Sequence, residues 1–353
     1  MENKININGR FIGASSAAYI IAEISGNHGG KLENAIELIK KAKELGADAV
    51  KLQTYTADTI TLNSSKKDFT LPSGNAWEDS NTLYNLYSEA FTPWEWHQKL
   101  FQTASEINID IFSSPFDETA VDFLESLDVP IYKIASPEIF DIQLLKKVAN
   151  TGKPIILSTG LARLEDIELA IDTLKNEGCS DIVLLKCSTS YPLPYEEVNL
   201  NTMVDFKEKF DVVIGLSDHT IGIGIPLAAV SMGAKVVEKH IVFENDETVD
   251  SFFSLKTDDF KNMVQEIRNI EKSFGEVTYE LSESVKKNEW AKRSLYFYKE
   301  LKKGEKIKGC YKSVRPGYGL HPKYFDEISD YVASRDIEIG DRVEWDLITK
   351  IKE

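Results

Sequence analysis

The chain has 353 residues, of which 42% are hydrophobic and 28% are charged, and a formal net charge of −16. This acidic balance, without a basic run that contains interleaved aromatic residues, argues against a nucleic-acid partner. No apolar run approaches the roughly 20 residues that span a bilayer, and MENKININGRFIG lacks the apolar core of a signal peptide, so we expect a cytoplasmic protein without a membrane partner. Three scattered cysteines fit a reducing compartment better than a disulfide framework.

Short runs rich in β-branched residues alternate with amphipathic segments along most of the chain. The runs predict strands at 19–24, 48–53, 109–114, 130–135, 154–159, 182–187, 212–217 and 235–240. Between them lie segments such as LENAIELIKKAKELGA and LEDIELAIDTLKNEG, with apolar residues at helical spacing. Eight strands interleaved with helices predict an α/β fold of the (β/α)8 TIM-barrel type. A doubly wound sheet is the main alternative, but no G-x-G-x-x-G follows the first strand.

Two regions fall outside this repeating pattern. The connection between the second and third strands, residues 54–108, is unusually long, and such loops on barrels are typically functional and cover the site. After the barrel (1–280), we expect a polar linker (281–293) and a small β-rich domain (294–353), in which ELKKGEKI and DIEIGDRV form a weak internal repeat.

Ionisable and hydroxyl side chains stand where the predicted strands end. The C-terminal strand ends of a barrel form its active-site rim, and polar groups are costly to bury there without partners. The set as a whole, rather than any one member, therefore predicts a site. Its members are Glu23, Lys51, Ser114, Lys133, Ser136, Glu138, Ser158, Thr189, Tyr191, His219, Glu238 and His240.

The two histidines that follow the seventh and eighth strands, His219 and His240, should converge on this rim. Two imidazoles without thiols suit a divalent metal that keeps positions open for water and substrate. A catalytic zinc normally has three protein ligands, so we favour an exchangeable ion such as manganese or magnesium. We expect Glu238 to lie on the same strand face as His240. His28, in the glycine-rich GNHGG, fits either a ligand contact or a plain turn, and Asp218 is a candidate helix cap.

The remaining rim residues suit an anionic substrate. Lys51 and Lys133 interrupt otherwise apolar strands, as cations in a pocket for phosphate or carboxylate would, although a lysine whose stem lies along the surface is the plainer alternative. The serines of SSP, IASPE and LSTG could donate hydroxyls to the same anion, or only cap helices. Glu23 and Glu138 are candidates for general acid–base groups or for anchors of substrate hydroxyls.

Seven short motifs, in this order, resemble the sialic acid synthase family: AEISGNHGG, VKLQTY, FSSPF, YKIASPE, PIILSTG, SDHT and VEKH. The resemblance covers nearly the whole chain, and VRPGYG resembles that family's antifreeze-like (SAF) domain. Within the family, LYNLYSEAFTPWEWH and VRPGYGLHPKYF are most similar to the pseudaminic acid synthases. CSTSYP supports that branch, because the N-acetylneuraminate branch has C-T-N-x-Y-P, with an asparagine in place of Thr189.

The resemblance implies a reaction between phosphoenolpyruvate and an acylated amino sugar, a 2,4-diacetamido-2,4,6-trideoxy hexose of the altrose type. It implies that His219 and His240 hold a divalent metal, with Mn²⁺ expected and Mg²⁺ or Co²⁺ possible, and that the chain forms a domain-swapped homodimer. The resemblance also implies that phosphoenolpyruvate is bound by Lys51, Lys133, Ser114, Ser136 and Ser158, and that Thr189 takes part in substrate binding. It implies contacts to the sugar and the reacting centre by Glu23, Glu138, Tyr191 and Asp250. Arg315 would reach the site from the partner subunit. A legionaminic or N-acetylneuraminic acid synthase and a non-catalytic sugar-binding barrel are the alternatives.

Overall fold

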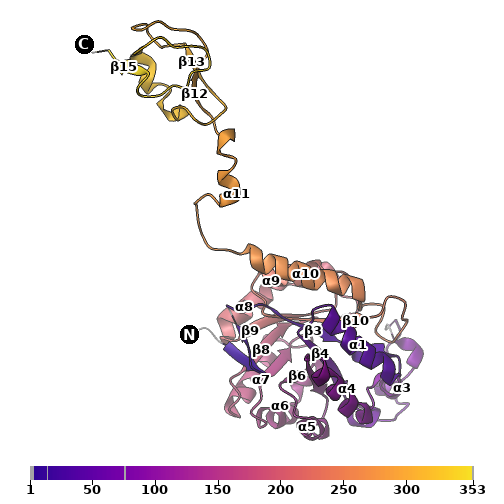
Figure 1. The fold of residues 1–353 in the computed structure, drawn as a ribbon. Coiled ribbons are helices and arrows are strands. Elements are labelled where there is room, and N and C mark those ends of the chain that lie inside the picture. Colours follow the sequence, from indigo (N-terminus) through magenta and orange to yellow (C-terminus); the bar gives the residue numbers. More distant parts are fainter. Residues whose placement is uncertain (1–3, 14, 75–76, 352–353) are drawn as a thin grey trace. The chain divides into compact units, whose positions relative to one another are not determined.

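The computed structural model describes residues 4–13, 15–74 and 77–351, which form two compact units, Met1–Gly275 and Glu276–Glu353. The first unit is a closed barrel of parallel strands in which β10 pairs with both β9 and β3 (Figure 1). The fold predicted from the sequence is thereby confirmed. The barrel strands are β3 (Tyr19–Glu23), β4 (Ala49–Thr54), β5 (Asp110–Pro115), β6 (Tyr132–Ile134), β7 (Ile155–Ser158), β8 (Ile182–Lys186), β9 (Val213–Asp218) and β10 (Val236–Val242).

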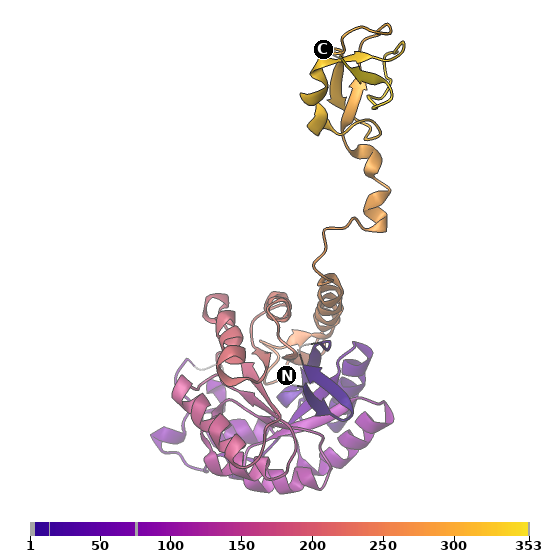
Figure 2. The same cartoon turned by 90° about the vertical axis from the view of Figure 1, so that its left-hand side faces the viewer.

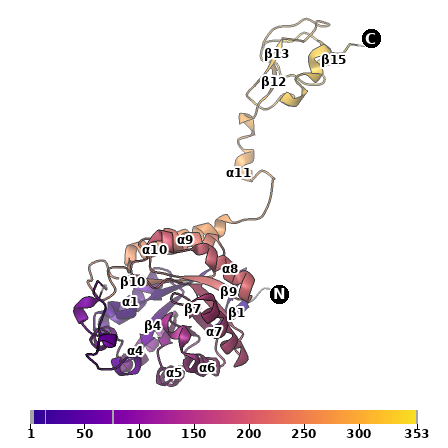
Figure 3. The same cartoon turned by 180° about the vertical axis from the view of Figure 1, so that it is seen from behind.

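Helices surround these strands, and all of them except the uniformly apolar α9 are amphipathic (Figure 3). Their apolar faces pack on the outward-pointing residues of the strands, as Leu38 and Ile39 do near Ile20 and Val50. The helices are α1 (Leu32–Glu44), α4 (Trp94–Glu106), α5 (Glu118–Glu125), α6 (Ile142–Ala149), α7 (Leu164–Asn176), α8 (Leu200–Phe210), α9 (Gly224–Ser231) and α10 (Thr257–Ser273). The long connection after β4 contains α2 (Ala57–Ile60) and α3 (Leu83–Ala90), and β11 (Leu255–Lys256) extends the sheet beside β10. No helix among the described residues has the length and hydropathy that a membrane span requires.

An N-terminal hairpin, which the sequence analysis did not predict, closes the end of the barrel where the strands begin (Figure 2). Its strands β1 (Lys4–Ile7) and β2 (Arg10–Gly13) pair antiparallel. Ile5, Ile7 and Ile12 are buried in one apolar cluster with barrel-interior residues such as Tyr19. Asn8 donates to Asp110 Oδ1 at the start of β5 (2.8 Å). The hairpin therefore seals the barrel floor with apolar side chains.

The second unit carries its own small core and two antiparallel strand pairs. The pairs are β12 (Ser294–Phe297) with β13 (Tyr311–Val314), and β14 (Tyr331–Ala333) with β15 (Ile348–Lys350). The short helix α11 (Glu283–Lys286) precedes them.

The two copies of the weak internal repeat, ELKKGEKI and DIEIGDRV, form equivalent halves of this unit. Leu301 N donates to Ile337 O (3.1 Å) and Ile337 N donates back to Leu301 O (2.8 Å). Gly304 N and Gly340 N, which occupy matching positions of the repeat, each donate to a carbonyl of the opposite half (2.7 and 2.9 Å). Each half thus completes the backbone hydrogen bonding of the other.

Candidate active site

Side chains alternate between the two faces of a barrel strand, and the inward-facing set changes character along the barrel. Near the floor it is apolar, with residues such as Phe112, Ile156 and Val236. At the C-terminal ends the same alternation turns polar side chains inward, because a residue two positions along a strand keeps its face. These buried inward-facing residues are Glu23, Lys51, Ser114, Lys133, Ser158, Ser217, Glu238 and His240.

Two lysines and two glutamates form a buried charge cluster in this layer. Lys51 Nζ lies 2.5 Å from Glu23 Oε2 and 3.7 Å from Glu238 Oε1, and Lys133 Nζ lies 3.9 Å from Glu238 Oε1. Burial by itself lowers the pKa of Lys51, but Glu23 and Glu238 raise that pKa above its ordinary value, so its ammonium form is retained. Burial lowers the pKa of Lys133 and raises that of Glu23. Glu23 and Glu238 thus offset part of the free-energy cost of burying the two lysines.

The serines line the same layer with available hydroxyls. Lys51 Nζ donates to Ser114 Oγ (3.4 Å). Ser136 Oγ accepts from Leu161 N (2.8 Å) and from Thr189 Oγ1 (3.3 Å), which leaves its own proton for another acceptor. Ser158 Oγ is buried and has no hydrogen-bond partner among the described residues. A buried hydroxyl without a partner suits a ligand that supplies one.

Gly160 lets Ser136 and Thr189 approach each other. A Cβ atom at this position would lie 2.3 Å from Thr189 Oγ1, 2.8 Å from Ser136 Oγ and 3.1 Å from Cys187 Sγ. Gly160→Ala should therefore push both hydroxyls out of place and weaken anion binding at the rim by about tenfold or more, which is about 1.4 kcal/mol. Calorimetric titration with phosphoenolpyruvate measures this loss.

Gly224→Ala is the matched control for that variant, because a Cβ at Gly224 meets nothing within 4 Å. It should bind the anion as the wild type does. Equal affinities for both variants, with unchanged melting temperatures, would contradict the role assigned to Gly160.

The two histidines meet at the rim, with ring centroids 5.4 Å apart. His219 Nδ1 donates to Ser188 O (3.0 Å). Burial by itself lowers the pKa of His219, but its contact with Cys187 raises that pKa above its ordinary value. His240 Nδ1 is buried without a hydrogen-bond partner among the described residues, and burial lowers the pKa of His240 well below its ordinary value. A neutral imidazole with an unpartnered nitrogen is the form that binds a metal.

The donor set fits a sparsely coordinated metal. Among the residues that the structure describes, no group of three or more His, Cys, Asp or Glu side chains is arranged to hold an ion. His219 and His240 are the two donors that the sequence analysis named, and their binding of a metal, with water and substrate as further ligands, stays a prediction. Phe253 covers both rings, at centroid distances of 5.9 Å and 4.8 Å.

Glu138 follows β6 in a short 3₁₀ segment and has an unusual environment. Its Oε2 is buried and has no hydrogen-bond partner among the described residues. Burial raises the pKa of Glu138 to about 7, against smaller opposing effects of a hydrogen bond from its own backbone N–H and of Lys133. A carboxyl group with a pKa near neutrality can both give and take a proton at working pH.

Tyr191 and Asp250 also lie at the rim. The Tyr191 ring lies 4.5 Å from that of His219 and 5.4 Å from that of Trp77. Asp250 is buried and accepts a hydrogen bond from Ser25 Oγ. Trp77 belongs to the long connection after β4, and its Nε1 donates to Val249 O (3.0 Å), so this connection does extend over the rim.

The sequence analysis missed several residues of this layer, among them Ser25, Gln53, Trp77, Cys187 and Phe253. Trp77 and Phe253 lie in the loops that follow β4 and β10, so no periodic signal marks them. Gln53 had a signal, because it lies two positions after Lys51 on the same strand face.

The structure also answers two questions that the sequence left open, the roles of His28 and Asp218. His28 is buried, its Nε2 lies 3.2 Å from Thr92 Oγ1, and its Nδ1 accepts from Gly30 N (3.0 Å), so it is a structural turn residue. Asp218 does not cap α9, which begins at Gly224; it pairs with buried Lys239 (2.5 Å).

Arg315 belongs to the second unit, where it follows β13 and is exposed. It has no hydrogen bond or ion pair to any residue that the structure describes. Its role toward the barrel stays a prediction.

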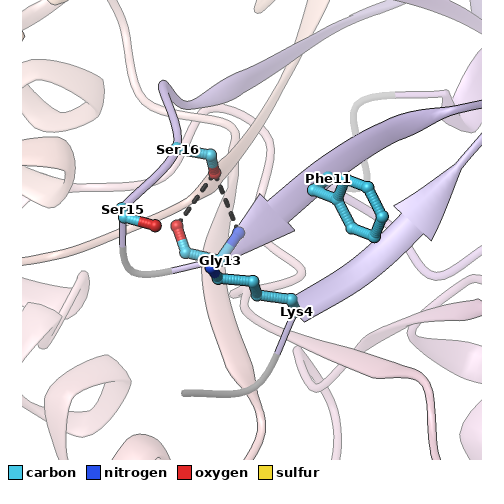
Figure 4. Close-up of a pocket in the computed structure, with 5 residues that line it drawn as sticks. All are labelled: Lys4, Phe11, Gly13, Ser15 and Ser16. Carbon is cyan, nitrogen blue, oxygen red and sulfur yellow. Dashed lines mark hydrogen bonds between the residues drawn. The ribbon is translucent and has the colours of Figure 1, made fainter.

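A separate surface pocket lies beside the N-terminal hairpin (Figure 4). It is lined by Lys4, Phe11, Gly13, Ser15 and Ser16, and Ser16 Oγ accepts from Gly13 N (2.8 Å) and donates to Gly13 O (2.9 Å). No rim residue contributes to it, so the candidate site remains at the opposite end of the strands.

The strand ends of this TIM barrel bring together two lysines, several serine hydroxyls and two histidines. This arrangement is typical of an enzyme that acts on an anionic substrate. The chain belongs to the NeuB family, whose model matches residues 38–279. It is 47% identical to the pseudaminic acid synthase of Campylobacter jejuni over 92% of this chain and 94% of that protein. It is 44% identical to the pseudaminic acid synthase of Helicobacter pylori over 90% and 93%. The crystal structure of an N-acetylneuraminic acid synthetase from Leptospira borgpetersenii, in complex with citrate, superimposes with a TM-score of 0.71, at 31% identity, over 82% of this chain and 95% of that one.

Proposed function

We propose that this chain is a pseudaminic acid synthase. It condenses phosphoenolpyruvate with a 2,4-diacetamido-2,4,6-trideoxy hexose of the altrose type and releases phosphate. The observation that carries this proposal is the buried lysine pair, Lys51 and Lys133, in one layer with the histidine pair. A non-catalytic sugar-binding barrel would have no reason to bury this charge cluster beside an unpartnered imidazole.

The reaction forms one carbon–carbon bond and one carbon–oxygen bond, the latter from water to carbon 2, and breaks the carbon–oxygen bond between carbon 2 and the phosphate. Carbon 3 of phosphoenolpyruvate attacks the aldehyde carbon of the open-chain sugar, and water adds to the cation that develops at carbon 2. The tetrahedral product collapses to the 2-keto acid, and phosphate leaves with the bridging oxygen. Lys51 and Lys133 stabilise the phosphate and carboxylate charges from fixed positions, without reorganisation.

The hydroxyls and carboxyls of the rim complete this assignment. Ser114, Ser136 and Ser158 donate to the phosphoenolpyruvate oxygens, and Thr189 supports Ser136 through the hydrogen bond described above. Glu138 exchanges a proton with the reacting water or the sugar oxygen, for which its pKa of about 7 is suited. Glu23, Tyr191 and Asp250 contact the sugar.

His219 and His240 hold a divalent metal in this proposal, with Mn²⁺ as the first candidate and Mg²⁺ or Co²⁺ as alternatives. A metal bound there supplies a Lewis acid that polarises the aldehyde oxygen. A cytoplasmic location is part of the same proposal and accords with three free cysteines, Cys179, Cys187 and Cys310.

Phosphate release with a panel of sugars tests the function. The altrose-type diacetamido sugar should support the highest kcat/KM with phosphoenolpyruvate. Phosphoenolpyruvate labelled with ¹⁸O at the bridging oxygen should yield labelled phosphate. A preference for the legionaminic precursor or for N-acetylmannosamine would assign the chain to the corresponding synthase, and no turnover with any sugar would favour the binding barrel.

The second unit is proposed to be an antifreeze-like (SAF) domain that acts on the partner's barrel in a domain-swapped homodimer. Each connection that follows β6 to β10 carries one large apolar side chain that is 43% to 58% exposed. We take these five exposed apolar side chains on the loops beyond the strand ends as support for a surface that another domain covers. The residues are Phe140, Leu161, Tyr195, Ile221 and Phe252.

Complementation between two inactive variants tests whether Arg315 acts in trans. Arg315→Ala subunits mixed one to one with Lys51→Met subunits should regain about a quarter of the wild-type rate, because each mixed dimer holds one intact site. Dimer exchange is verified with differently tagged subunits. The absence of any recovery in dimers shown to be mixed would contradict the swap.

A further inference from the structure

Ser25 holds a backbone conformation that its side chain disfavours. It follows β3 with φ of 47°, in the left-handed region, although glycine is the usual residue there. For a residue with a Cβ atom this conformation costs roughly 1–2 kcal/mol. Residues held in such regions cluster at functional sites, where the surrounding structure maintains them. The side chain of Ser25 should therefore have a use.

The hydroxyl of Ser25 joins two of the proposed sugar-binding carboxylates. Ser25 Oγ donates to Asp250 Oδ2 in the loop between β10 and β11. It accepts from Gln53 Nε2 (3.3 Å), and the same Gln53 Nε2 donates to Glu23 Oε1 (3.1 Å). Ser25, Glu23 and Asp250 are all buried, so these contacts are protected from water.

This chain of contacts fixes a loop residue to the rigid barrel. Asp250 belongs to a turn segment, whereas Glu23 and Gln53 stand on β3 and β4. Without the Ser25 hydroxyl, Asp250 would lose its side-chain link to those strand ends, and Gln53 would lose one of its two acceptors. The backbone N–H of Gly26 and the side chain of Trp77 also donate to Asp250, so without Ser25 the carboxylate should turn toward these remaining donors.

We propose that Ser25 is a positioning residue for the sugar half of the site: its hydroxyl orients Asp250 and, through Gln53, Glu23. This inference rests on the proposed function. It assigns to Ser25 no contact with phosphoenolpyruvate, so the main effect should fall on the sugar.

Two substitutions separate this role from a structural one. Ser25→Gly removes both the hydroxyl and the backbone strain, so its melting temperature should equal or exceed that of the wild type while KM for the sugar rises about tenfold. Ser25→Ala removes the hydroxyl and keeps the strain, so the same rise in KM should accompany a lower melting temperature. KM for phosphoenolpyruvate should change less than KM for the sugar in both variants, because Ser25 reaches Lys51 only indirectly, through Gln53 and Glu23.

Asn108→Gly is the matched control, because exposed Asn108 has a similar left-handed φ of 57° and precedes the start of β5, at the end of the barrel opposite the rim. It should also be as stable as the wild type or more so, with an unchanged KM for the sugar. A wild-type KM for the sugar in Ser25→Gly would overturn the inference.

A crystal structure of Ser25→Gly provides a readout that does not depend on the substrate. The Asp250 carboxylate should leave its wild-type orientation, and an unchanged carboxylate would also overturn the inference. Failure of the wild-type enzyme to use any sugar of the panel speaks instead against the proposed function, so the two failures are distinguishable.

Discussion

Glu138→Gln is expected to lower kcat by about two to four orders of magnitude, the contribution typical of a general acid or base. The amide has nearly the shape of the carboxylic acid but cannot exchange a proton. The variant should fold, because Glu138 Oε2 makes no hydrogen bond to the described residues that the substitution would break. Steady-state rates of phosphate release measure the loss. Exposed Glu168 on α7 offers a control, since Glu168→Gln should retain the wild-type rate.

The pH dependence of the wild type gives a second measurement of the same residue. With the pKa of Glu138 at about 7, the kcat/KM profile should have a limb near that pH, and the limb should be absent from Glu138→Gln. A limb that rises with pH identifies Glu138 as the base, and one that falls identifies it as the acid. A profile without any limb near pH 7 contradicts the assignment.

Stability should respond to the same raised pKa. Between the ordinary pKa of 4.5 and about 7, the folded state holds a proton that the unfolded state has lost. The stabilisation from the protonated carboxyl is therefore complete below pH 4.5 and is lost as the pH rises through about 7. Glu138→Gln lacks this dependence, so its melting temperature relative to the wild type should be higher at pH 8 than at pH 5.

His240→Ala should lower turnover by about a thousandfold or more, because Lewis-acid stabilisation at such sites amounts to several kcal/mol. Chelation of the wild type should abolish turnover, and added manganese should restore it. The same manganese concentration should not restore His240→Ala, whose metal content, measured by mass spectrometry, should be reduced. His321→Ala is the control, since His321 is exposed in the second unit. Undiminished turnover of the wild type in chelator would contradict the metal assignment.

The sequence predicted the fold and the charged rim for one physical reason. Strand periodicity fixes which side chains point inward, and parallel strands end together, so Lys51, Lys133, His219 and His240 had to lie near one another once the barrel was recognised. Their placement in the structure agrees with that expectation. Their catalytic roles stay predictions.

The contacts that orient these residues could not be predicted in the same way. Ser25 and Asp250 meet because a loop after β10 folds back over β3, and no periodic pattern encodes that meeting. The N-terminal hairpin did leave a signal, since Asn8 and Gly9 form the kind of two-residue turn that joins antiparallel strands, and both have positive φ.

The sealed barrel floor has a consequence for the order of events in turnover. Because Ile5, Ile7 and Ile12 fill the far end, both substrates and both products must use the same opening. The lysines on the strands lie deeper than the loop residues Tyr191 and Asp250, so a bound sugar would obstruct the path to them. If the lysines bind phosphoenolpyruvate and Tyr191 and Asp250 contact the sugar, as proposed, phosphoenolpyruvate should enter first, and initial-rate kinetics should show an ordered scheme.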